Sequence, residues 1–173
     1  MDSEELRATQ APIKAKYRED PASSHFTLKA EGTLDGSGVT CKVATARGIA
    51  EAGLHPATGG DGLSLCSGDL LLEALVACAG VTLKAVSTAL EIPVRGGRVF
   101  AEGDLDFRGT LAVSKEVPVG FLAIRLRFEL DCDATEEQLA TLLKLTERYC
   151  VIYQTIRTAP KMEIQADRIM TNL

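Results

Sequence analysis

Apolar and polar residues alternate with a period of two in several parts of the chain, which predicts β-strands. The alternation over residues 25–47 is interrupted by the turn sequence DGSG and predicts a β-hairpin with Cys41 on its apolar face. Residues 98–107 and 121–131 alternate most regularly and suit an antiparallel pair. A short final strand is expected over residues 162–166. Residues 48–66 contain several glycines and a proline and predict a loop with room for one short strand.

Three other segments follow the pattern of helices. Residues 67–91 are apolar nearly all round, so this helix must be covered on most sides by a sheet, another helix or a partner subunit. Asp133 and Glu136 have the spacing of a capping box before a second helix, whose leucines 139, 142, 143 and 145 form the buried stripe and which ends just before Cys150. Asp2 and Glu5 have the same spacing, so residues 1–24 are interpreted as an appended helix and linker.

This order of elements predicts an α+β fold in which antiparallel sheets flank two central helices. The length of 173 residues suits one compact domain, which we expect to span residues 25–173 behind the N-terminal extension of residues 1–24.

Composition and charge limit the kinds of partner that the protein can bind and the cellular compartments in which we expect it. The 19 basic and 24 acidic side chains give a net charge of −5 with no basic cluster, so we expect no nucleic-acid partner. The first residues contain neither a basic leader nor an apolar run, which predicts a cytoplasmic protein. The longest charge-free apolar stretch of the helical pattern, residues 74–83, is far shorter than the ~20 residues of a membrane span, so no membrane association is expected.

Few motifs point to a cofactor or metal, and we expect neither. The chain has no C-x-x-C pair and only His25 and His55 as histidines, which argues against zinc. The glycines at 59, 60 and 62 lack the ending of a phosphate loop, and no serine triad motif is present. The odd number of cysteines, five, argues against a disulfide framework.

Cysteine positions are more informative, although the pattern alone favours core packing for each of them, Cys41 and Cys132 included. Cys78 lies about three turns inside the apolar helix, too far from its N-terminus for the helix dipole to lower the thiol pKa. An activated thiolate at Cys78 would therefore need an arginine or lysine from another segment.

The residues around these cysteines resemble a known family. The stretch SGDLLLEALVAC (residues 67–78), with Gly59-Gly60 upstream and ERYCVIYQT (residues 147–155) downstream, is similar to the OsmC/Ohr family of thiol peroxidases, and the similarity spans about residues 25–168. It implies an organic hydroperoxide reductase in which Cys78 attacks the peroxide and Cys150 resolves the sulfenic acid. It also implies a dithiol reductant, typically a dihydrolipoyl group, and an intertwined homodimer with the cysteine-bearing helices at its centre.

The chain departs from the pattern of this family at the start of the long helix. Active members commonly carry a Pro-Glu pair there, whose carboxylate holds an arginine over the thiolate, whereas this chain has SGD at residues 67–69. Asp69 is the candidate acid, one residue from the usual position, and Arg47 is the candidate arginine. Arg47 is equally well interpreted as a solvated charge at a strand end. Val151 follows the second cysteine, where the family often has proline.

Three functions stay open at this point. Two cysteines that match the pair of the family favour peroxide reduction by Cys78 and Cys150. The missing Glu-Arg signature favours a non-catalytic dimer that binds a small hydrophobic ligand. A thiol redox sensor without turnover is the third possibility.

Overall fold

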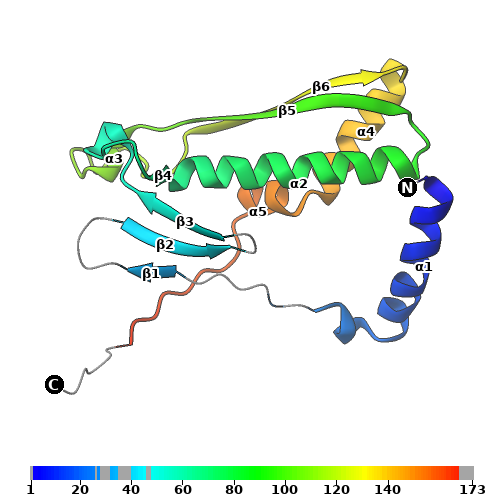
Figure 1. The fold of residues 1–173 in the computed structure, drawn as a ribbon, viewed down its shortest axis with the longest axis horizontal. Helices are drawn as coiled ribbons and strands as arrows, with labels where there is room; N and C mark the ends of the chain where they lie inside the picture. The colour runs from blue at the N-terminus through cyan, green and yellow to red at the C-terminus, as the bar shows by residue number, and fades with distance from the viewer. Residues whose placement is uncertain (1, 26, 28–31, 35–39, 46–47, 168–173) are drawn as a thin grey trace.

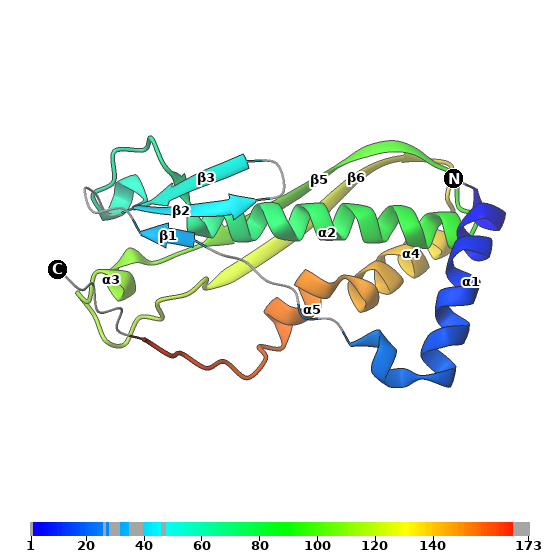
Figure 2. The same ribbon diagram turned by 60° about the horizontal axis from the view of Figure 1, so that its bottom comes forward.

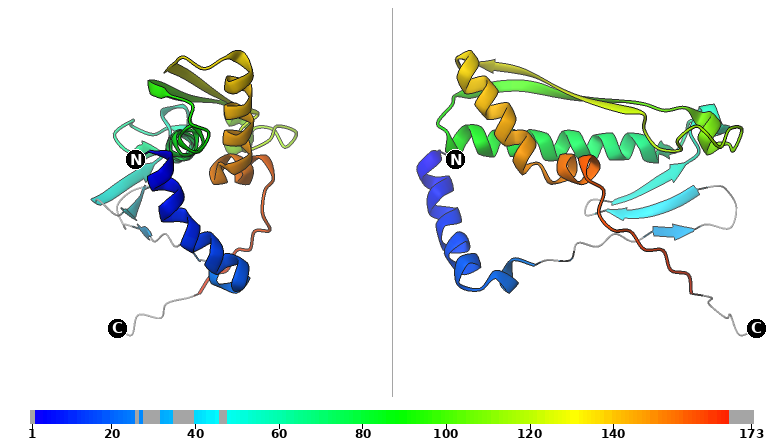
Figure 3. Two further views of the ribbon diagram at one scale, coloured as in Figure 1. Left: turned by 90° about the vertical axis from the view of Figure 1, so that its right-hand side faces the viewer. Right: turned by 180° about the vertical axis from the view of Figure 1, so that it is seen from behind.

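The computed structural model describes residues 2–25, 27, 32–34, 40–45 and 48–167 of the chain. A long central helix, α2 (Ser67–Ala89), runs along most of the molecule, with the hairpin of β5 (Val94–Asp104) and β6 (Ala123–Cys132) on one side (Figure 1). A second helix, α4 (Glu136–Tyr149), leads into the short α5 (Val151–Arg157) beside the middle of α2 (Figure 3). The predicted α+β fold is confirmed.

The β5–β6 hairpin confirms the antiparallel pair predicted from the most regular alternation. Its register places Val99 opposite Phe128 and Gly103 opposite Ile124. Every second side chain of β6 is half-buried towards the helices, and the intervening charged ones are exposed. On that exposed face Arg125 forms an ion pair with Asp104. The first strand begins at Val94, earlier than predicted, and the chain leaves the ladder after Asp104 to form the single-turn helix α3 (Phe107–Thr110).

A second sheet holds the N-terminal strands in the order β1 (Gly32–Leu34), β2 (Thr40–Thr45), β3 (Gly48–Gly53) and β4 (Leu65–Cys66). The antiparallel β1–β2 pair agrees with the predicted hairpin. The turn, residues 26, 28–31 and 46–47 of that hairpin and the side chain of Cys41 lie outside the described part of the chain.

The prediction of a loop with room for one short strand over residues 48–66 did not place that strand, which the structure puts in the first part of the segment as β3. β3 pairs with β2 along its whole length, from Thr45 opposite Gly48 to Thr40 opposite Gly53. Both glycines stand at the ends of the strand, where they do not interrupt the ladder, and a cross-strand partner outweighs the weak strand propensity of the residues between them. The short 3-10 helix η2 (Pro56–Thr58) follows before β4.

Helix α2 is buried along only one stripe. Leu75, Ala79, Leu83 and Ser87, spaced by four residues, are buried against the hairpin and α4, whereas Val81 on another face is 73% exposed. When Lys84 is included, α2 is long and apolar enough to cross a membrane by length and composition alone, with a mean hydropathy of 1.8. The core helix of a soluble protein can have the same length and composition. The charge-free residues 74–83, on which the sequence prediction was based, are therefore only part of the apolar length of this helix. Lys84 Nζ donates a hydrogen bond to the carbonyl of Val94 at 2.9 Å.

The cap of α4 differs from the predicted one. Thr135 is the N-cap: its hydroxyl accepts a hydrogen bond from the Gln138 N–H at 3.2 Å, and Gln138 Oε1 accepts one from the Thr135 N–H at 2.9 Å. The predicted pair of Asp133 and Glu136 is wrong because Arg95 binds the Asp133 carboxylate in an ion pair instead. Of the predicted leucine stripe Leu142 is fully buried, Leu139 and Leu145 are half-buried, and Leu143 is exposed.

The two ends of the chain lie apart from the core. α1 (Ser3–Glu19) has the predicted capping box of Asp2 and Glu5, and the 3-10 helix η1 (Pro21–Ser24) follows it. No residue of α1 is buried, and the Ser3 hydroxyl donates to Glu91 at the far end of α2 (Figures 1 and 2). The predicted strand over residues 162–166 is wrong: the segment is extended, without a ladder partner among the described residues, and Ile164 is 97% exposed. A segment with an alternating pattern forms a β-strand only where the unpaired edge of another strand is available to hydrogen-bond with it.

Candidate functional site

Cys150 stands at the junction of α4 and α5, where the backbone turns between the two helices. Its φ of −74° and ψ of 108° are extended rather than helical, so it is the C-cap of α4 and the N-cap of α5. Its N–H donates to the Thr146 carbonyl at 2.9 Å, and its own carbonyl accepts from the Gln154 N–H at 3.0 Å. The side chain is 1% exposed, so the junction holds the thiol inside the protein.

Cys78 approaches this junction from the middle of α2. Its half-buried side chain packs against the cluster of Leu75, Ala79 and Cys150, which is completed by apolar side chains of the β5–β6 hairpin. The packing places the thiols of Cys78 and Cys150 close enough for the ionisation of each to affect the pKa of the other. The structure therefore brings together the two cysteines singled out in the sequence.

The surroundings of Cys78 favour its thiolate. Burial raises the pKa of this thiol, but the backbone N–H groups of Ile152 and Val151, the thiol of Cys150 and the side chain of Thr82 hydrogen-bond to its sulfur. Together they bring the pKa of Cys78 below its usual value. Among the described residues, no arginine or lysine is one of the groups that lower this pKa.

The pKa of Cys150 moves in the opposite direction. Burial raises it, and the neighbouring sulfur of Cys78 raises it further, while the N–H groups of Tyr153 and Ile152 lower it only in part. Of the two coupled thiols Cys78 ionises first. Environments that push the pKa values of two neighbouring groups apart give them different chemical roles.

Of the other two predicted site residues, only Asp69 is described, and it does not lie beside Cys78. Asp69 lies in the first turn of α2 with an exposed side chain, nine residues and therefore about 14 Å along the helix axis from Cys78. Asp69 has no hydrogen-bond or ion-pair partner among the described residues, and Arg47 lies outside them. Cys66 and Cys132 are free, half-buried thiols.

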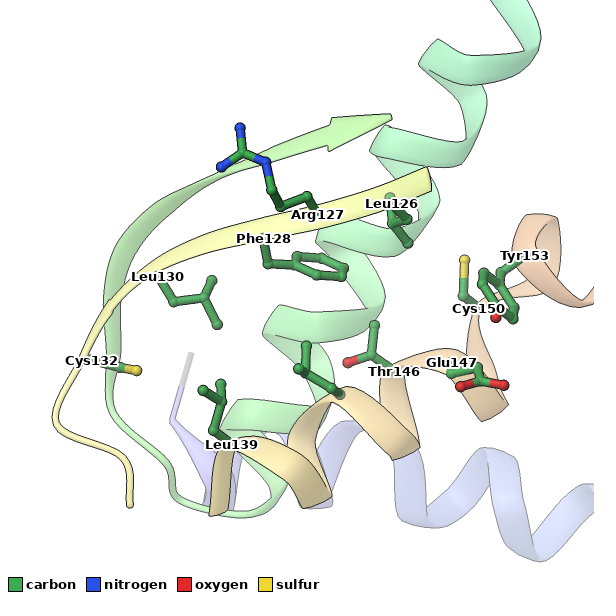
Figure 4. A pocket seen from close by; sticks show the side chains of 11 residues that line it. Leu126, Arg127, Phe128, Leu130, Cys132, Leu139, Thr146, Glu147, Cys150 and Tyr153 are labelled. Atoms are coloured by element: carbon green, nitrogen blue, oxygen red, sulfur yellow. The ribbon is translucent and has the colours of Figure 1, made fainter. Parts of the chain in front are cut away.

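A cavity of about 470 Å³ reaches the thiol of Cys150 from the side of β6 and α4. Figure 4 shows Cys150 and Tyr153 at one end and Cys132 at the other, while Arg127 points away. A second cavity, of about 890 Å³, is formed mainly by apolar side chains of α2, the segment before β6, α5 and the C-terminal segment, and it also includes Tyr153. In the part of the chain that is described, no three His, Cys, Asp or Glu side chains are grouped so that they could hold a metal ion.

Sequence reasoning missed Thr82 and the N–H groups of Val151 and Ile152. Thr82 follows Cys78 by four residues, a spacing that places both on one face of a helix, so this signal was available. No sequence signal reveals the backbone amides, because their position depends on how α5 packs against α2.

Comparison with known proteins places these features in a family. The family model of OsmC-like proteins matches residues 59–165. The fold is similar to that of an OsmC-like protein from Mycoplasma pneumoniae, with 13% identity, a TM-score of 0.64, and coverage of 78% of this chain and 89% of that one. A comparison with curated proteins finds no match.

Two further solved structures have the same fold. One is an organic hydroperoxide resistance protein OsmC from Legionella pneumophila, with 18% identity, a TM-score of 0.60, and coverage of 78% of this chain and 92% of that one. The other is an organic hydroperoxide resistance protein from Elizabethkingia anophelis with bound thiocyanate, with 16% identity, a TM-score of 0.63, and coverage of 79% and 91%. The match to the family model covers well over half of the sequence, so this chain belongs to the OsmC-like protein family.

Proposed function

We propose that this protein is a thiol-dependent peroxidase that reduces organic hydroperoxides, with Cys78 as the peroxidatic and Cys150 as the resolving cysteine. The observation that carries the proposal is the pair of thiols packed in one cluster, whose pKa values are shifted in opposite directions, down at Cys78 and up at Cys150. A peroxidatic sulfur must attack as a thiolate, whereas its partner can wait as a thiol. Family membership supports the same chemistry.

The reaction has three balanced steps. The Cys78 thiolate attacks one peroxide oxygen, so an S–O bond forms, the O–O bond breaks, and the alkoxide leaves and takes up a proton to become the alcohol. The thiol of Cys150 then attacks the sulfenic acid on Cys78, which forms the disulfide and releases water. A dithiol reductant finally reduces the disulfide by exchange and is itself oxidised to a disulfide.

The remaining assignments rest on the family and the sequence. We assign the reductant to the dithiols, with a dihydrolipoyl protein as the candidate, and place the reaction in the cytoplasm with a homodimer as the working unit. Arg47 is proposed as a cation that adds to the stabilisation of the thiolate, with Asp69 as the acid that orients it.

Consumption of an organic hydroperoxide such as cumene hydroperoxide, with dithiothreitol as electron donor, tests the function. The wild-type protein should turn over repeatedly and Cys78→Ser should not, whereas Cys66→Ser, a matched change at another half-buried free thiol, should stay active. Full activity in Cys78→Ser, or no turnover by the wild type, would overturn the proposal.

Binding of a small hydrophobic ligand without catalysis is the second candidate, and the apolar cavity of about 890 Å³ favours it. The same assay separates the alternatives. A binder neither consumes peroxide nor forms a disulfide, whereas a redox sensor forms a stable Cys78–Cys150 disulfide without turnover.

A further inference from the structure

The side chain of Thr82 is placed to act on the sulfur of Cys78. Residues four apart lie above one another on the same face of an α-helix, and Thr82 follows Cys78 by four residues in α2. Both side chains are half-buried, on the side of the helix that faces the α4–α5 junction. Thr82 is also among the groups that lower the pKa of Cys78.

Other hydroxyls in the long helices are used differently. The Thr88 hydroxyl donates to the carbonyl of Lys84 at 2.8 Å, and the Thr146 hydroxyl donates to that of Leu142 at 2.8 Å. This bond to the carbonyl four residues earlier is the usual choice for threonine in a helix. The described structure gives the Thr82 hydroxyl no such acceptor, so its single proton is available to the sulfur.

The rest of the environment makes such a hydrogen bond effective. The side chain of Cys150 does not cap α5, and the amides of Val151 and Ile152 face the sulfur of Cys78 instead. The hairpin side chains that pack on the same cluster are apolar, such as Val99 and Leu126. Among the described residues, the titratable side chains that pack in this cluster beside Cys78 are those of Cys150 and Tyr153. With apolar neighbours on one side, a donor to a charged sulfur contributes more than it would in water.

We infer that Thr82 is a thiolate-stabilising residue of this site, whose hydroxyl donates a hydrogen bond to the ionised sulfur of Cys78. Its contribution to peroxide reduction rests on the proposed function, but its effect on the ionisation of Cys78 does not. The hydroxyl thereby shares with the two amides a role that the family pattern assigns to a guanidinium.

The test is the pH dependence of Cys78 alkylation by iodoacetamide in the full chain, followed at this residue by peptide mass spectrometry. Thr82→Val removes the hydroxyl and keeps the shape, and it should leave about 3- to 10-fold less thiolate at a pH below the midpoint, so that the midpoint moves to higher pH. Thr82→Ser keeps the hydroxyl and should resemble the wild type. Thr88→Val, which removes a hydroxyl bonded to a backbone carbonyl on the same helix, should leave the profile unchanged.

A Thr82→Val profile that coincides with the wild-type profile would overturn the inference. If Thr82→Val does not fold, the pair Thr82→Ser and Thr82→Ala decides, because both lack the methyl group and only the serine retains a donor; equal profiles would then overturn it. No peroxide is present in this assay. If Thr82→Val shifts the alkylation midpoint of Cys78 but the wild-type protein consumes no hydroperoxide, the inference about Thr82 is supported and the proposed function is wrong.

Discussion

At the scale of single residues, the site depends on where one helix ends and the next begins. Cys150 caps both helices at once, and this position presents the N–H groups of Val151 and Ile152 to the sulfur of Cys78. Hydrogen bonds to the charged form of a group lower the pKa of an acid, and here they outweigh the opposite effect of burial on Cys78. The lowered pKa of Cys78 therefore depends on backbone groups from a distant part of the chain.

The pH dependence of thiol reactivity follows from these pKa shifts. The thiolate is the reacting form, and the pKa of Cys78 is lowered, so alkylation of Cys78 should reach half of its maximal rate at a lower pH than alkylation of a cysteine in a short unstructured peptide. The pKa of Cys150 is raised, so its midpoint should lie above that of the same peptide. Site-resolved alkylation across pH 5 to 10 measures both, and the reverse order of midpoints would contradict the assigned roles.

Arg47 and Asp69 give a second residue-level prediction. If Arg47 supplies a cation to Cys78, Arg47→Ala should raise the pKa of Cys78 and slow its reaction with hydroperoxide by ~10-fold or more. Asp69→Asn should have a smaller effect, because it loosens the arginine without removing it. Stopped-flow measurement of the peroxide step gives the rates. The same Cys78 pKa in the wild type and in Arg47→Ala would exclude Arg47 as an activator.

The sequence identified part of this site in advance. The two cysteines could be named because the motif around each resembles a family, whereas periodicity alone suggested only core packing. The amides could not be named, since any residue supplies an N–H and only the fold decides where it points. The separation of Asp69 from Cys78 by nine residues of helix could be read from the sequence, but its exposure could not, because the pattern of an all-apolar helix does not show which face is covered.

At the scale of elements, strong periodicity predicted the structure well and competing contacts explain the failures. The β5–β6 alternation and the length of α2 are as expected because each pattern is long and uninterrupted. The position of β3 within residues 48–66 could not be predicted, because its glycines are typical of a loop and only the pairing with β2 makes the segment a strand. The capping box of α4 was misplaced by two residues because Asp133 is held by Arg95.

The observed cap of α4 predicts a specific stability effect. Thr135→Ala removes the acceptor for the Gln138 N–H and should lower the free energy of unfolding by about 1 kcal/mol. Thr141→Ala, the same substitution at an exposed position within α4, should not destabilise the protein, since alanine is the better helix former. Urea denaturation followed by circular dichroism compares the two. Equal stabilities of the two variants would argue against Thr135 as the cap.

At the scale of the whole molecule, a single chain leaves too much surface uncovered. It exposes 13613 Å², whereas a compact monomer of 18.5 kDa would expose about 8,200 Å². The uncovered apolar surface includes Val81 on α2 and the extended C-terminal segment with Ile164. Folded proteins rarely leave apolar surface of this extent in water, so a second chain is the expected cover.

We therefore predict an obligate homodimer that buries well over ~2,000 Å² of mostly apolar surface. Light scattering at micromolar concentration should give twice the 18.5 kDa mass of one chain. Val81→Lys should weaken the dimer, whereas Val113→Lys, at a loop position of similar exposure (73% and 71%), should not. A stable, folded particle of 18.5 kDa would contradict the prediction.

The central claim is that the peroxide oxidises Cys78 to a sulfenic acid and that Cys150 then condenses with it. Trapping this sulfenic acid tests the claim most directly. Cys150→Ser, treated with one equivalent of organic hydroperoxide in the presence of dimedone, should carry the dimedone adduct on Cys78, because no thiol remains to condense with the sulfenic acid. The wild-type protein under the same conditions should instead yield a Cys78–Cys150 disulfide without the adduct. An adduct on Cys66 or Cys132, or an unmodified Cys78 in the variant, would contradict the account.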